Sequence, residues 1–285
     1  EKVFLIFFFV NALLIGALYA LHLAPTLQQP VVDGVFWISF VLMFVVHAIT
    51  CCSDPGKVPT EGKPHKLYRK ALELAASGRI DEAEEIGALC HTCRIARPLR
   101  SKHCQVLKTC VSCFDHNCPY VHNTVGARNY RSFVVFMLFG WIAISAALYG
   151  TGHHLLTTVS RDGWARRDGW FVALLADLCM CELFAVLMNS YHFNLIARNL
   201  TTNEHMHLTR YVYLRDDLGR FNNAFSRGVC ANLVEFCRRG RLTSDNPYYY
   251  SELFASSRKA RVAGGDGVAL GGMKTSLLGG SEDAA

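Results

Sequence analysis

Four long apolar runs constrain this chain more than any other feature of its sequence. They cover residues 3–24, 31–52, 133–152 and 170–196, each close to the roughly 20 residues that a helix needs to cross a membrane. The first run is too long for a cleaved signal peptide and has no small-residue cleavage site. With 51% apolar and 18% charged residues arranged in this way, the chain is predicted to be an all-α integral membrane protein with four transmembrane helices.

Lys and Arg are concentrated in two of the segments outside these runs. Residues 53–131 carry 13 of them and the residues after 196 carry 12, whereas the link 25–30 has none. Because cytosolic loops carry the excess of positive charge, both large segments are predicted to be cytosolic. The net charge of +6 suits anionic headgroups or phosphorylated ligands, and no motif indicates nucleic acid.

Most of the 12 cysteines lie in the segments assigned to the cytosol, where thiols stay reduced, so they indicate metal binding or catalysis. Cys90 and Cys93 form a Cys-x-x-Cys knuckle, and His103, Cys104 and Cys110 follow at spacings that suit a tetrahedral zinc site. A structural zinc contributes on the order of 10–16 kcal/mol in finger peptides, enough to order a segment with few apolar residues. A cysteine-rich zinc domain is therefore predicted between the second and third spans.

A wider pattern surrounds these ligands. It consists of Asp54-Pro55-Gly56, Arg97-Pro98-x-Arg100, Asp115-His116-Asn117-Cys118-Pro119, Asn123, Val125-Gly126, Asn129, Phe133, Thr201-Thr202-x-Glu204 and Phe225-x-x-Gly228-x-x-x-Asn232-x-x-x-Phe236. It resembles the Asp-His-His-Cys (DHHC) protein S-acyltransferases, or palmitoyltransferases, over nearly the whole chain to Phe236. The stretches "LELAASGRIDEAEEIGALC" and "NLIARNLTTNE" further resemble the branch that carries N-terminal ankyrin repeats, although this sequence begins at Glu1 without them.

The resemblance implies two interleaved Cys3His zinc sites. The first maps onto Cys90, Cys93, His103 and Cys110. The second would need ligands at Cys104, Leu107, Asn117 and Thr124. Three of these last four residues are not zinc ligands of the required kind, so we expect one structural zinc ion, with Leu107 and Val106 packing where the second would lie. Asn117 also makes the signature Asp-His-Asn-Cys. Cys113 and His122 are expected at the surface, although together with Cys104 they could form a makeshift metal site.

The resemblance also assigns catalytic roles. Cys118 would be the nucleophile, His116 its base and Asp115 the group that orients His116. The implied reaction moves a long-chain acyl group, such as palmitoyl, from acyl-CoA to Cys118 and then to cysteines of substrate proteins. Structural support for the catalytic loop is expected from Thr201, Thr202, Glu204 and Asn232, the first three of which also have the spacing of a helix-capping box.

Basic residues could meet the phosphates of CoA, although lipid headgroups explain any single one as well. They are Arg97, Arg100, Lys102, Arg128 and Arg131. Small residues of the third span could open an acyl cavity or serve close helix packing. They are Gly140, Ala143, Ala146, Ala147 and Gly150.

The predicted organisation follows the chain. It comprises two transmembrane helices (1–52), a cytosolic helical linker (53–89), the cysteine-rich zinc and catalytic domain (90–131), two further transmembrane helices (132–196), a cytosolic C-terminal segment (197–255) and a disordered tail (256–285). The expected partners are acyl-CoA, membrane lipids and proteins with cytosolic cysteines, and the expected location is an endomembrane, Golgi or ER.

Two other function classes are open at this stage. A catalytically inactive membrane adaptor that retains one structural zinc would explain the missing second site, but not the intact Asp115, His116 and Cys118. A transporter would use Asp177 and Glu182 within the fourth span, but it leaves the zinc segment unexplained. Both acids could instead bind Asn11, His22 or His47 at a helix interface.

Overall fold

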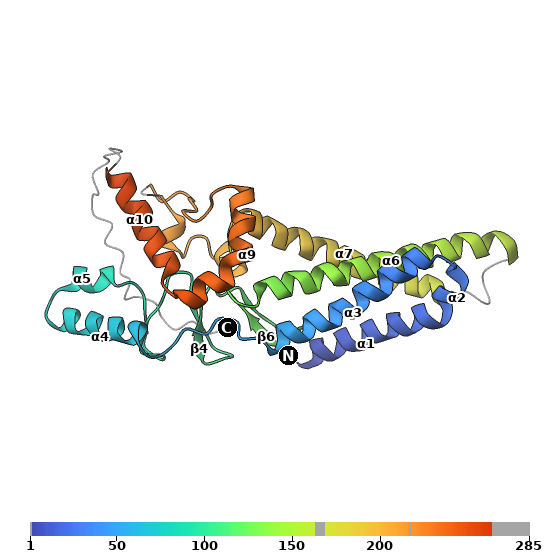
Figure 1. Cartoon of the computed structure of the whole chain (residues 1–285), viewed down its shortest axis with the longest axis horizontal. Helices are drawn as coiled ribbons and strands as arrows, with labels where there is room; N and C mark the ends of the chain where they lie inside the picture. Colours follow the sequence, from blue (N-terminus) through green and yellow to red (C-terminus); the bar gives the residue numbers. More distant parts are fainter. Residues whose placement is uncertain (1, 163–168, 217, 264–285) are drawn as a thin grey trace. The chain divides into compact units, whose positions relative to one another are not determined.

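The structure is a computed structural model that describes residues 2–162, 169–216 and 218–263 (Figure 1). It is mostly helical, but the short strands of the cysteine-rich region depart from the predicted all-α fold. The helices are α1 (Lys2–Leu18), α2 (Ala24–Leu27), α3 (Pro30–Cys52), α4 (Lys63–Ala76), α5 (Ile80–Glu85), α6 (Tyr130–Asp162), α7 (Gly169–Ala197), α8 (Thr202–Met206), α9 (Val229–Asp245) and α10 (Tyr249–Ala263), with a π-helical turn at Tyr19–Leu23 and a 3-10 turn at Val212–Leu214. The strands are β1 (Leu89–Cys90), β2 (Ile95–Ala96), β3 (Lys102–Cys104), β4 (Thr109–Val111), β5 (His116–Cys118) and β6 (Asn123–Val125).

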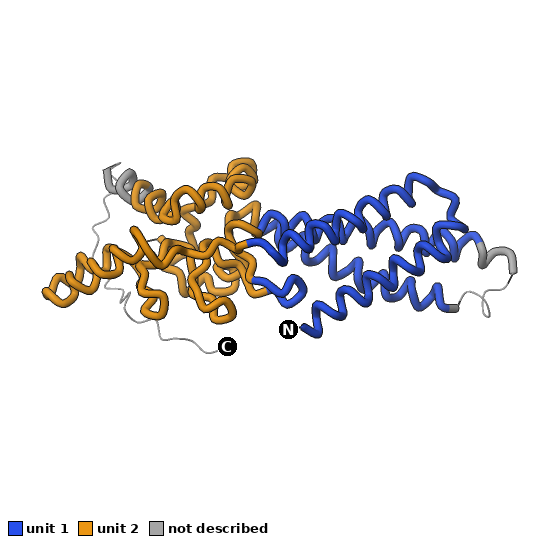
Figure 2. Tube along the Cα trace, turned by 60° about the horizontal axis from the view of Figure 1, so that its bottom comes forward, with its two compact units in different colours: residues 1–53, 118–123, 130–194 blue, residues 54–117, 124–129, 195–285 orange. Residues whose placement is uncertain are grey.

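The chain divides into two compact units, coloured separately in Figure 2. Unit 1 comprises residues 1–53, 118–123 and 130–194. Unit 2 comprises residues 54–117, 124–129 and 195–285. The β5–β6 hairpin contributes to both, because residues 118–123 belong to unit 1 and the rest of the hairpin to unit 2.

Four helical segments among the described residues are long and apolar enough to cross a membrane, and they coincide with the four predicted runs. They are Lys2–Leu27, Pro30–Cys52, Tyr130–Thr157 and Trp170–Ala197. The first ends before Gln28, whose φ of 50° is left-handed. Pro30 then begins α3, where its fixed φ and missing N–H suit the first helical turn. The predicted number and positions of candidate membrane helices are confirmed.

Small residues of α6 allow close packing inside unit 1. Ala143 and Ala147 are buried in the same core as Tyr19 and Phe36, whose stacked rings lie 3.8 Å apart between centroids. A Cβ added to Gly150 would come within 3.3 Å of a Leu27 methyl group. This face of the third span therefore serves helix packing, the second of its two predicted roles.

Both acids of the fourth span have polar partners in unit 1. Asp177 accepts a hydrogen bond from Asn11 at 3.3 Å, one of the expected partners. Glu182 instead accepts hydrogen bonds from Trp141 Nε1 at 2.7 Å and from Ser145 Oγ at 3.0 Å, and the sequence did not indicate these partners.

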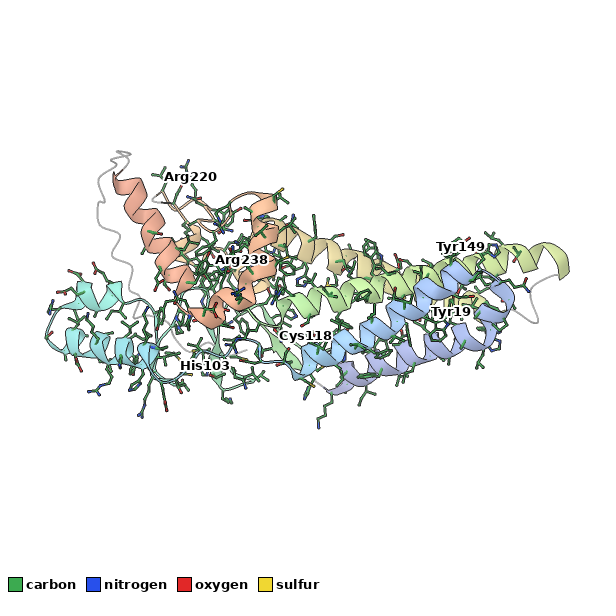
Figure 3. All side chains as sticks on the ribbon, viewed as in Figure 1. Tyr19, His103, Cys118, Tyr149, Arg220 and Arg238 are labelled. Atoms are coloured by element: carbon green, nitrogen blue, oxygen red, sulfur yellow. The ribbon has the colours of Figure 1, made fainter. Side chains whose placement is uncertain are left out.

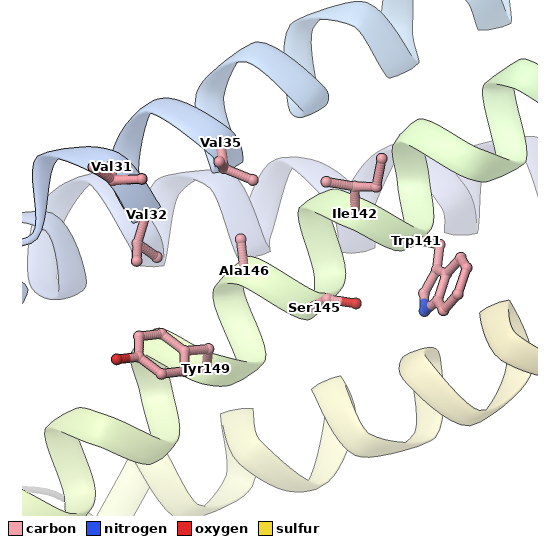
Figure 4. Close-up of a pocket in the computed structure, with 8 residues that line it drawn as sticks. All are labelled: Val31, Val32, Val35, Trp141, Ile142, Ser145, Ala146 and Tyr149. Atoms are coloured by element: carbon pink, nitrogen blue, oxygen red, sulfur yellow. The ribbon is translucent and has the colours of Figure 1, made fainter.

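An open apolar groove of about 350 Å³ lies between α3 and α6 (Figure 4). Its lining includes Val31, Val35, Trp141, Ser145 and Tyr149.

Unit 2 begins with a turn that docks on the cysteine-rich region. The Asp54 carboxylate accepts the N–H groups of Gly56 and Lys57, both at 3.0 Å. The backbone then runs along β4, where Ser112 N–H binds the Gly56 carbonyl at 2.9 Å and Val58 N–H binds the Cys110 carbonyl at 2.8 Å. The turn at Asp54-Pro55-Gly56 and the residues after it therefore position β4, the strand that carries Cys110.

The remaining elements of unit 2 are helical. Helices α4 and α5 form the predicted linker, and α4 buries Tyr68, Ala71 and Leu74 along one face before Gly78 ends it with a φ of 79°. At the other end of the chain, α10 continues to Ala263. The first residues of the predicted disordered tail, from residue 256 on, thus belong to α10, and residues 264–285 lie outside the described part of the chain.

Candidate functional site

The four residues of the first predicted zinc site lie together in unit 2. Their ligand atoms are all within 4.8 Å of one another. His103 Nδ1 lies 3.3 Å from Cys93 Sγ, 3.5 Å from Cys90 Sγ and 3.9 Å from Cys110 Sγ. Three sulfurs around one imidazole nitrogen form the donor set that structural zinc prefers. The structure thus confirms a cluster that can hold a metal ion (His103, Figure 3).

The electrostatics of this cluster also suit a cation. A hydrogen bond from Cys110, aided by others from Cys93, lowers the pKa of Cys90 to about 4. The hydrogen bond to Cys90, together with burial, raises the pKa of Cys110, and burial and the charge of Cys90 raise that of Cys93. Ionisation of the Cys90 thiol therefore opposes ionisation of the other two thiols. A bound divalent cation would offset the repulsion between the negative sulfurs, so that all three thiols could ionise.

The four positions of the second predicted site also lie together, each 14 residues after its counterpart in the first. Cys104 Sγ lies 3.2 Å from Asn117 Oδ1 and 3.1 Å from Thr124 Oγ1, and the Thr124 hydroxyl donates to Asn117 at 2.7 Å. Leu107 packs partly buried on the apolar cluster that contains Cys104. Cys104, Asn117 and Thr124 are thus hydrogen-bonded to one another at three of the positions where the resemblance implies zinc ligands. Val106 differs from expectation, since it is 50% exposed.

The hairpin turns share one backbone geometry. In the first two, the N–H of Cys93 or Leu107 points at the sulfur three residues earlier, at 3.4 Å in both cases. The next residues, Arg94 and Lys108, are left-handed, with φ of 54° and 53°, and His122 follows 14 residues later with 47°. Three copies of a 14-residue knuckle therefore run from residue 90 to the β5–β6 hairpin.

The third copy contains Cys118, which Figure 3 labels. In the 14-residue repeat it stands at the position of Cys90 and Cys104. Its second knuckle position is Val121, which has no metal-binding atom. In the described part of the chain the Cys90 group is the sole cluster of this type, and Cys118 is outside it. Cys118 is buried, with 7% of its surface exposed. The repeat therefore explains how a cysteine in a zinc-knuckle turn is left without partner ligands.

Asp115 and His116 are brought together as predicted. His116 Nδ1 lies 2.7 Å from Asp115 Oδ2, and the carboxylate is 1% exposed. Thr202 holds the same carboxylate twice, through its N–H at 2.8 Å and its hydroxyl at 2.6 Å. Because a carboxylate only accepts, Nδ1 carries the hydrogen and Nε2 keeps its lone pair. This is the tautomer that a general base requires.

Strand β5 determines which way the signature side chains point. Alternate residues of a strand face the same side, so His116 and Cys118 share one face of β5 and Asn117 faces the other. The hydrogen bonds of Asn117 to Cys104 and Thr124 agree with this alternation. The Asn117 side chain therefore lies on the face of β5 that meets Cys104 and Thr124, and the opposite face carries His116 and Cys118.

Arg100 contradicts its predicted role. Its side chain is fully buried, and it donates to both Glu204 oxygens, from Nε at 2.8 Å and from a terminal nitrogen at 2.7 Å. The rings of Phe225 and Tyr250 cover the guanidinium, each 4.8 Å away. Burial alone would lower the pKa of Arg100, but the Glu204 carboxylate raises it well above its usual value. Arg100 is a structural ion-pair partner and cannot meet CoA phosphates.

The other predicted basic residues differ among themselves. Lys102 binds Asn203 Oδ1 at 3.2 Å and lies over the Phe114 ring. Arg128 pairs with Asp54 at 2.6 Å, and it and Arg131 remain exposed, while Arg97 is half-buried. Contact with CoA stays a prediction for these four residues, which are Arg97, Lys102, Arg128 and Arg131.

The predicted support residues join α8 and α9 to the end of α7. Thr201 and Glu204 form the capping box of α8, with Glu204 N–H on the Thr201 hydroxyl at 3.1 Å and Thr201 N–H on the Glu204 carboxylate at 2.9 Å. Asn232, 1% exposed, donates to the Ala197 carbonyl at 2.6 Å. The start of α8, where Thr202 lies, is thereby fixed by the capping box, and the end of α7 is fixed by Asn232.

Sequence reasoning missed Asn199 and misplaced Cys113. Asn199 is 1% exposed, accepts hydrogen bonds from Arg100 and Arg239, and has a φ of 50°. The available signal is an Asn shortly after a long helix, since Asn tolerates the left-handed backbone conformation.

Cys113 is buried beside Phe225 and Tyr250 rather than at the surface, and burial raises the pKa of its thiol.

Comparison with known proteins agrees with this geometry. Residues 83–209 match the family described as DHHC palmitoyltransferase. This segment is a DHHC palmitoyltransferase domain. The chain is 32% identical to "Palmitoyltransferase ZDHHC17" of Homo sapiens over 201 residues, which cover 65% of this chain and 30% of that protein. It is 31% identical to "Palmitoyltransferase Hip14" of Drosophila melanogaster over 212 residues, 70% and 32% of the two chains.

A further relative is "Palmitoyltransferase ZDHHC8" of Homo sapiens, 33% identical over 244 residues, which cover 78% of this chain and 29% of that protein. The alignments thus span about a third of the length of these curated relatives. The family resemblance noted in the sequence is confirmed for the DHHC palmitoyltransferase domain.

Proposed function

We propose that this protein is a protein S-acyltransferase that moves a long-chain acyl group, palmitoyl in particular, from acyl-CoA to cysteines of substrate proteins. One observation carries the proposal. The Asp115 carboxylate, buried and held by Thr202, fixes the His116 tautomer on the strand whose same face carries Cys118, a cysteine outside the metal cluster.

The chemistry follows from these groups. His116 Nε2 takes the proton of the Cys118 thiol, and Asp115 stabilises the imidazolium that forms. The Cys118 thiolate attacks the thioester carbonyl of acyl-CoA, and the CoA thiolate leaves and recovers the proton. A cysteine of the substrate protein then attacks the acyl-enzyme in the same way. Each step exchanges one thioester for another, so no further energy source is needed.

The metal is assigned a structural role. Zinc would be held by Cys90, Cys93, His103 and Cys110, whose atoms already converge. With three sulfurs and one nitrogen as ligands, such an ion would have no free position for a substrate. Its contribution would be to fix β1, β3 and β4, and no step of the reaction would pass through it.

The membrane arrangement extends the proposal. Both basic segments, 53–131 and the residues after 196, would face the cytosol of an endomembrane, Golgi or ER. There Arg128 and Arg131, which are exposed, would meet CoA phosphates or anionic headgroups. The acyl chain would remain among the lipids.

The direct test is to incubate the purified chain with palmitoyl-CoA and to map acylated peptides by mass spectrometry. A hydroxylamine-labile acyl group on Cys118, followed by its transfer to a cysteine peptide, is the expected result. If the purified chain binds zinc but stays unlabelled, the result would instead support the inactive adaptor. That alternative also agrees with the predicted absence of a second metal site.

Replacing His116 with Gln should change the pH dependence of acyl-enzyme formation. A positioned general base contributes roughly 10²- to 10⁴-fold, so the rate at neutral pH should fall by that order. Without the base, the residual rate should keep rising with pH toward and beyond about 8.5, where an ordinary cysteine thiol ionises. Single-turnover rates between pH 6 and 10 measure this. Parallel profiles for the variant and the wild type would contradict the role of His116.

Replacing Thr202 with Val should weaken the support of Asp115. The variant keeps the N–H and loses the hydroxyl, and a hydrogen bond to a charged group is worth about 1.5–3 kcal/mol. Since about 1.4 kcal/mol corresponds to a factor of ten, we expect roughly tenfold slower acyl-enzyme formation and a lower melting temperature. Thr202→Ser retains the hydroxyl and should restore the rate. Equal loss in both variants would show that the hydroxyl is not the cause.

A further inference from the structure

Helix α9 has an inverted distribution of polar and apolar side chains. Its aliphatic residues are on the outside, since Val229 is 50% exposed, Leu233 37% and Val234 57%. The side chains that it buries are polar. They are Asn232, Glu235, Arg239 and Thr243. A surface helix of a globular protein normally shows the opposite arrangement, with an apolar face toward the core.

The polar side of α9 is buried because its side chains have specific partners. Glu235 accepts hydrogen bonds from the Tyr250 hydroxyl and from Arg227, both at 2.9 Å. Arg239 donates to Asn199 Oδ1 at 2.9 Å. Hydrogen bonds that involve a charged group are stronger than neutral ones, so these contacts orient α9 without using its aliphatic residues. The fold therefore holds the aliphatic residues on the outside.

Val229, Leu233 and Val234 form one patch, the aliphatic patch of α9. At about 3.6 residues per turn, they fall within about 140° of the helix circumference, on the side opposite the buried polar residues. Single exposed aliphatic residues are ordinary on protein surfaces and need no partner. Three of them together, on a helix whose other side is polar, indicate a face that meets an apolar environment.

The first turns of α9 are attached to the end of a candidate membrane span. The span Trp170–Ala197 ends at Ala197, whose carbonyl accepts a hydrogen bond from Asn232 Nδ2 at 2.6 Å. Asn232 lies between Val229 and Leu233 in the sequence. The patch is therefore within about one helix diameter, 10–12 Å, of the point where the apolar run of α7 ends. This continuity favours lipid as the medium that covers the patch.

The exposed charges beside the patch are mainly positive. Arg238, labelled in Figure 3, and Arg241 are exposed on the second half of α9. The acid near them is Asp245, whose oxygen lies 3.9 Å from Arg241 in an exposed pair. An aliphatic face bordered by arginines is typical of helices that lie in the membrane interface, where the guanidinium groups meet anionic headgroups.

We propose that α9 lies in the membrane interface, with its aliphatic patch in contact with lipid and with Arg238 and Arg241 on anionic headgroups. The partner is the bilayer rather than a soluble protein or a second copy of this chain. The contact would also steady the turn after α7, to which α9 is joined through Ala197 and Asn199. Acyl transfer has no part in this contact, which is therefore independent of the proposed function.

The test places a photo-crosslinking benzophenone amino acid in place of Val234 in the full chain, in nanodiscs of phosphatidylcholine and phosphatidylserine. Illumination should give lipid adducts on the α9 peptide, which mass spectrometry detects. The matched control carries the same amino acid in place of Glu73, which is 69% exposed on α4, and should give no lipid adduct. Adducts with a second chain in place of lipid, or equal lipid adducts at both positions, would overturn the proposal.

Substitutions test the two kinds of contact separately, with the crosslinker kept in place of Val234. Arg238→Gln and Arg241→Gln should lower the yield of lipid adducts roughly fivefold for each charge removed when phosphatidylserine is present, and not in phosphatidylcholine alone. Leu233→Asp should lower the yield in both lipids. All three residues are exposed, so circular dichroism should remain unchanged. An unchanged yield in Leu233→Asp would overturn the aliphatic contact, and unchanged yields in both arginine variants would overturn the headgroup contact.

Discussion

Cys118→Ser is expected to abolish acyl transfer, with a loss of roughly 10³-fold or more in both acyl-enzyme formation and transfer to a substrate cysteine. A serine hydroxyl is a far weaker nucleophile than a thiolate at neutral pH, and an oxyester would not exchange readily with the next thiol. Because every later step passes through the same sulfur, no other group of the site can compensate. Incorporation of labelled palmitate, released by hydroxylamine, measures both reactions.

The control for this variant is Cys230→Ser. Cys230 is exposed on α9 and belongs to no cluster described above, so its loss should leave incorporation unchanged. Circular dichroism and zinc content should be the same in both variants, because Cys118 is not among the metal-binding residues. Wild-type levels of hydroxylamine-labile label in Cys118→Ser would refute the assignment of the nucleophile.

The features that the sequence predicted well depend on short-range geometry. A Cys-x-x-Cys turn followed by His103 and Cys110 is selected by the metal, whatever the surrounding fold, and the four atoms do converge. The capping box likewise depends on residues only three positions apart, Thr201 and Glu204. Hydropathy alone locates the four candidate membrane helices.

The features that were missed depend on contacts between distant parts of the chain. The sequence shows Arg100 only as a positive charge near the site. Its burial depends on Glu204 and on the rings of Phe225 and Tyr250, all more than 100 residues away. The same aromatic cluster buries Cys113. No local pattern distinguishes an arginine that binds phosphate from one that pairs inside the fold.

The 14-residue repeat connects the metal site and the proposed catalytic cysteine. In the first copy, Cys90, Cys93 and His103 converge with Cys110 of the second copy. The second copy has Cys104, but Leu107, Asn117 and Thr124 stand 14 residues after the other three members of that cluster. The third copy has Cys118, on the strand that also carries His116. The same turn geometry therefore carries Cys90, which converges with three other candidate metal ligands. It also carries Cys118, which lies outside that cluster.

This difference between copies yields the second large effect, in the matched pair Cys110→Ser and Cys104→Ser. Cys110 belongs to the cluster that could hold a metal ion, whereas Cys104 lies outside it and contacts Asn117, Thr124 and the N–H of Leu107. A structural zinc contributes on the order of 10–16 kcal/mol, comparable to or larger than the whole stability of an ordinary domain, about 5–15 kcal/mol. We expect about one zinc per chain in the wild type and in Cys104→Ser, and close to none in Cys110→Ser. Serine at 104 can retain the hydrogen bonds, so that variant should remain folded.

Atomic emission on the purified chains measures the metal, and limited proteolysis across residues 90–131 measures the order of the segment. Cys110→Ser should be cleaved rapidly there and should fail to form the acyl-enzyme, because β4 would no longer be held against β3 and the turn at Gly56. Two zinc ions per wild-type chain, or loss of metal from Cys104→Ser, would mean that Cys104 also takes part in metal binding. The repeat would then not explain why some cysteines bind metal and Cys118 does not.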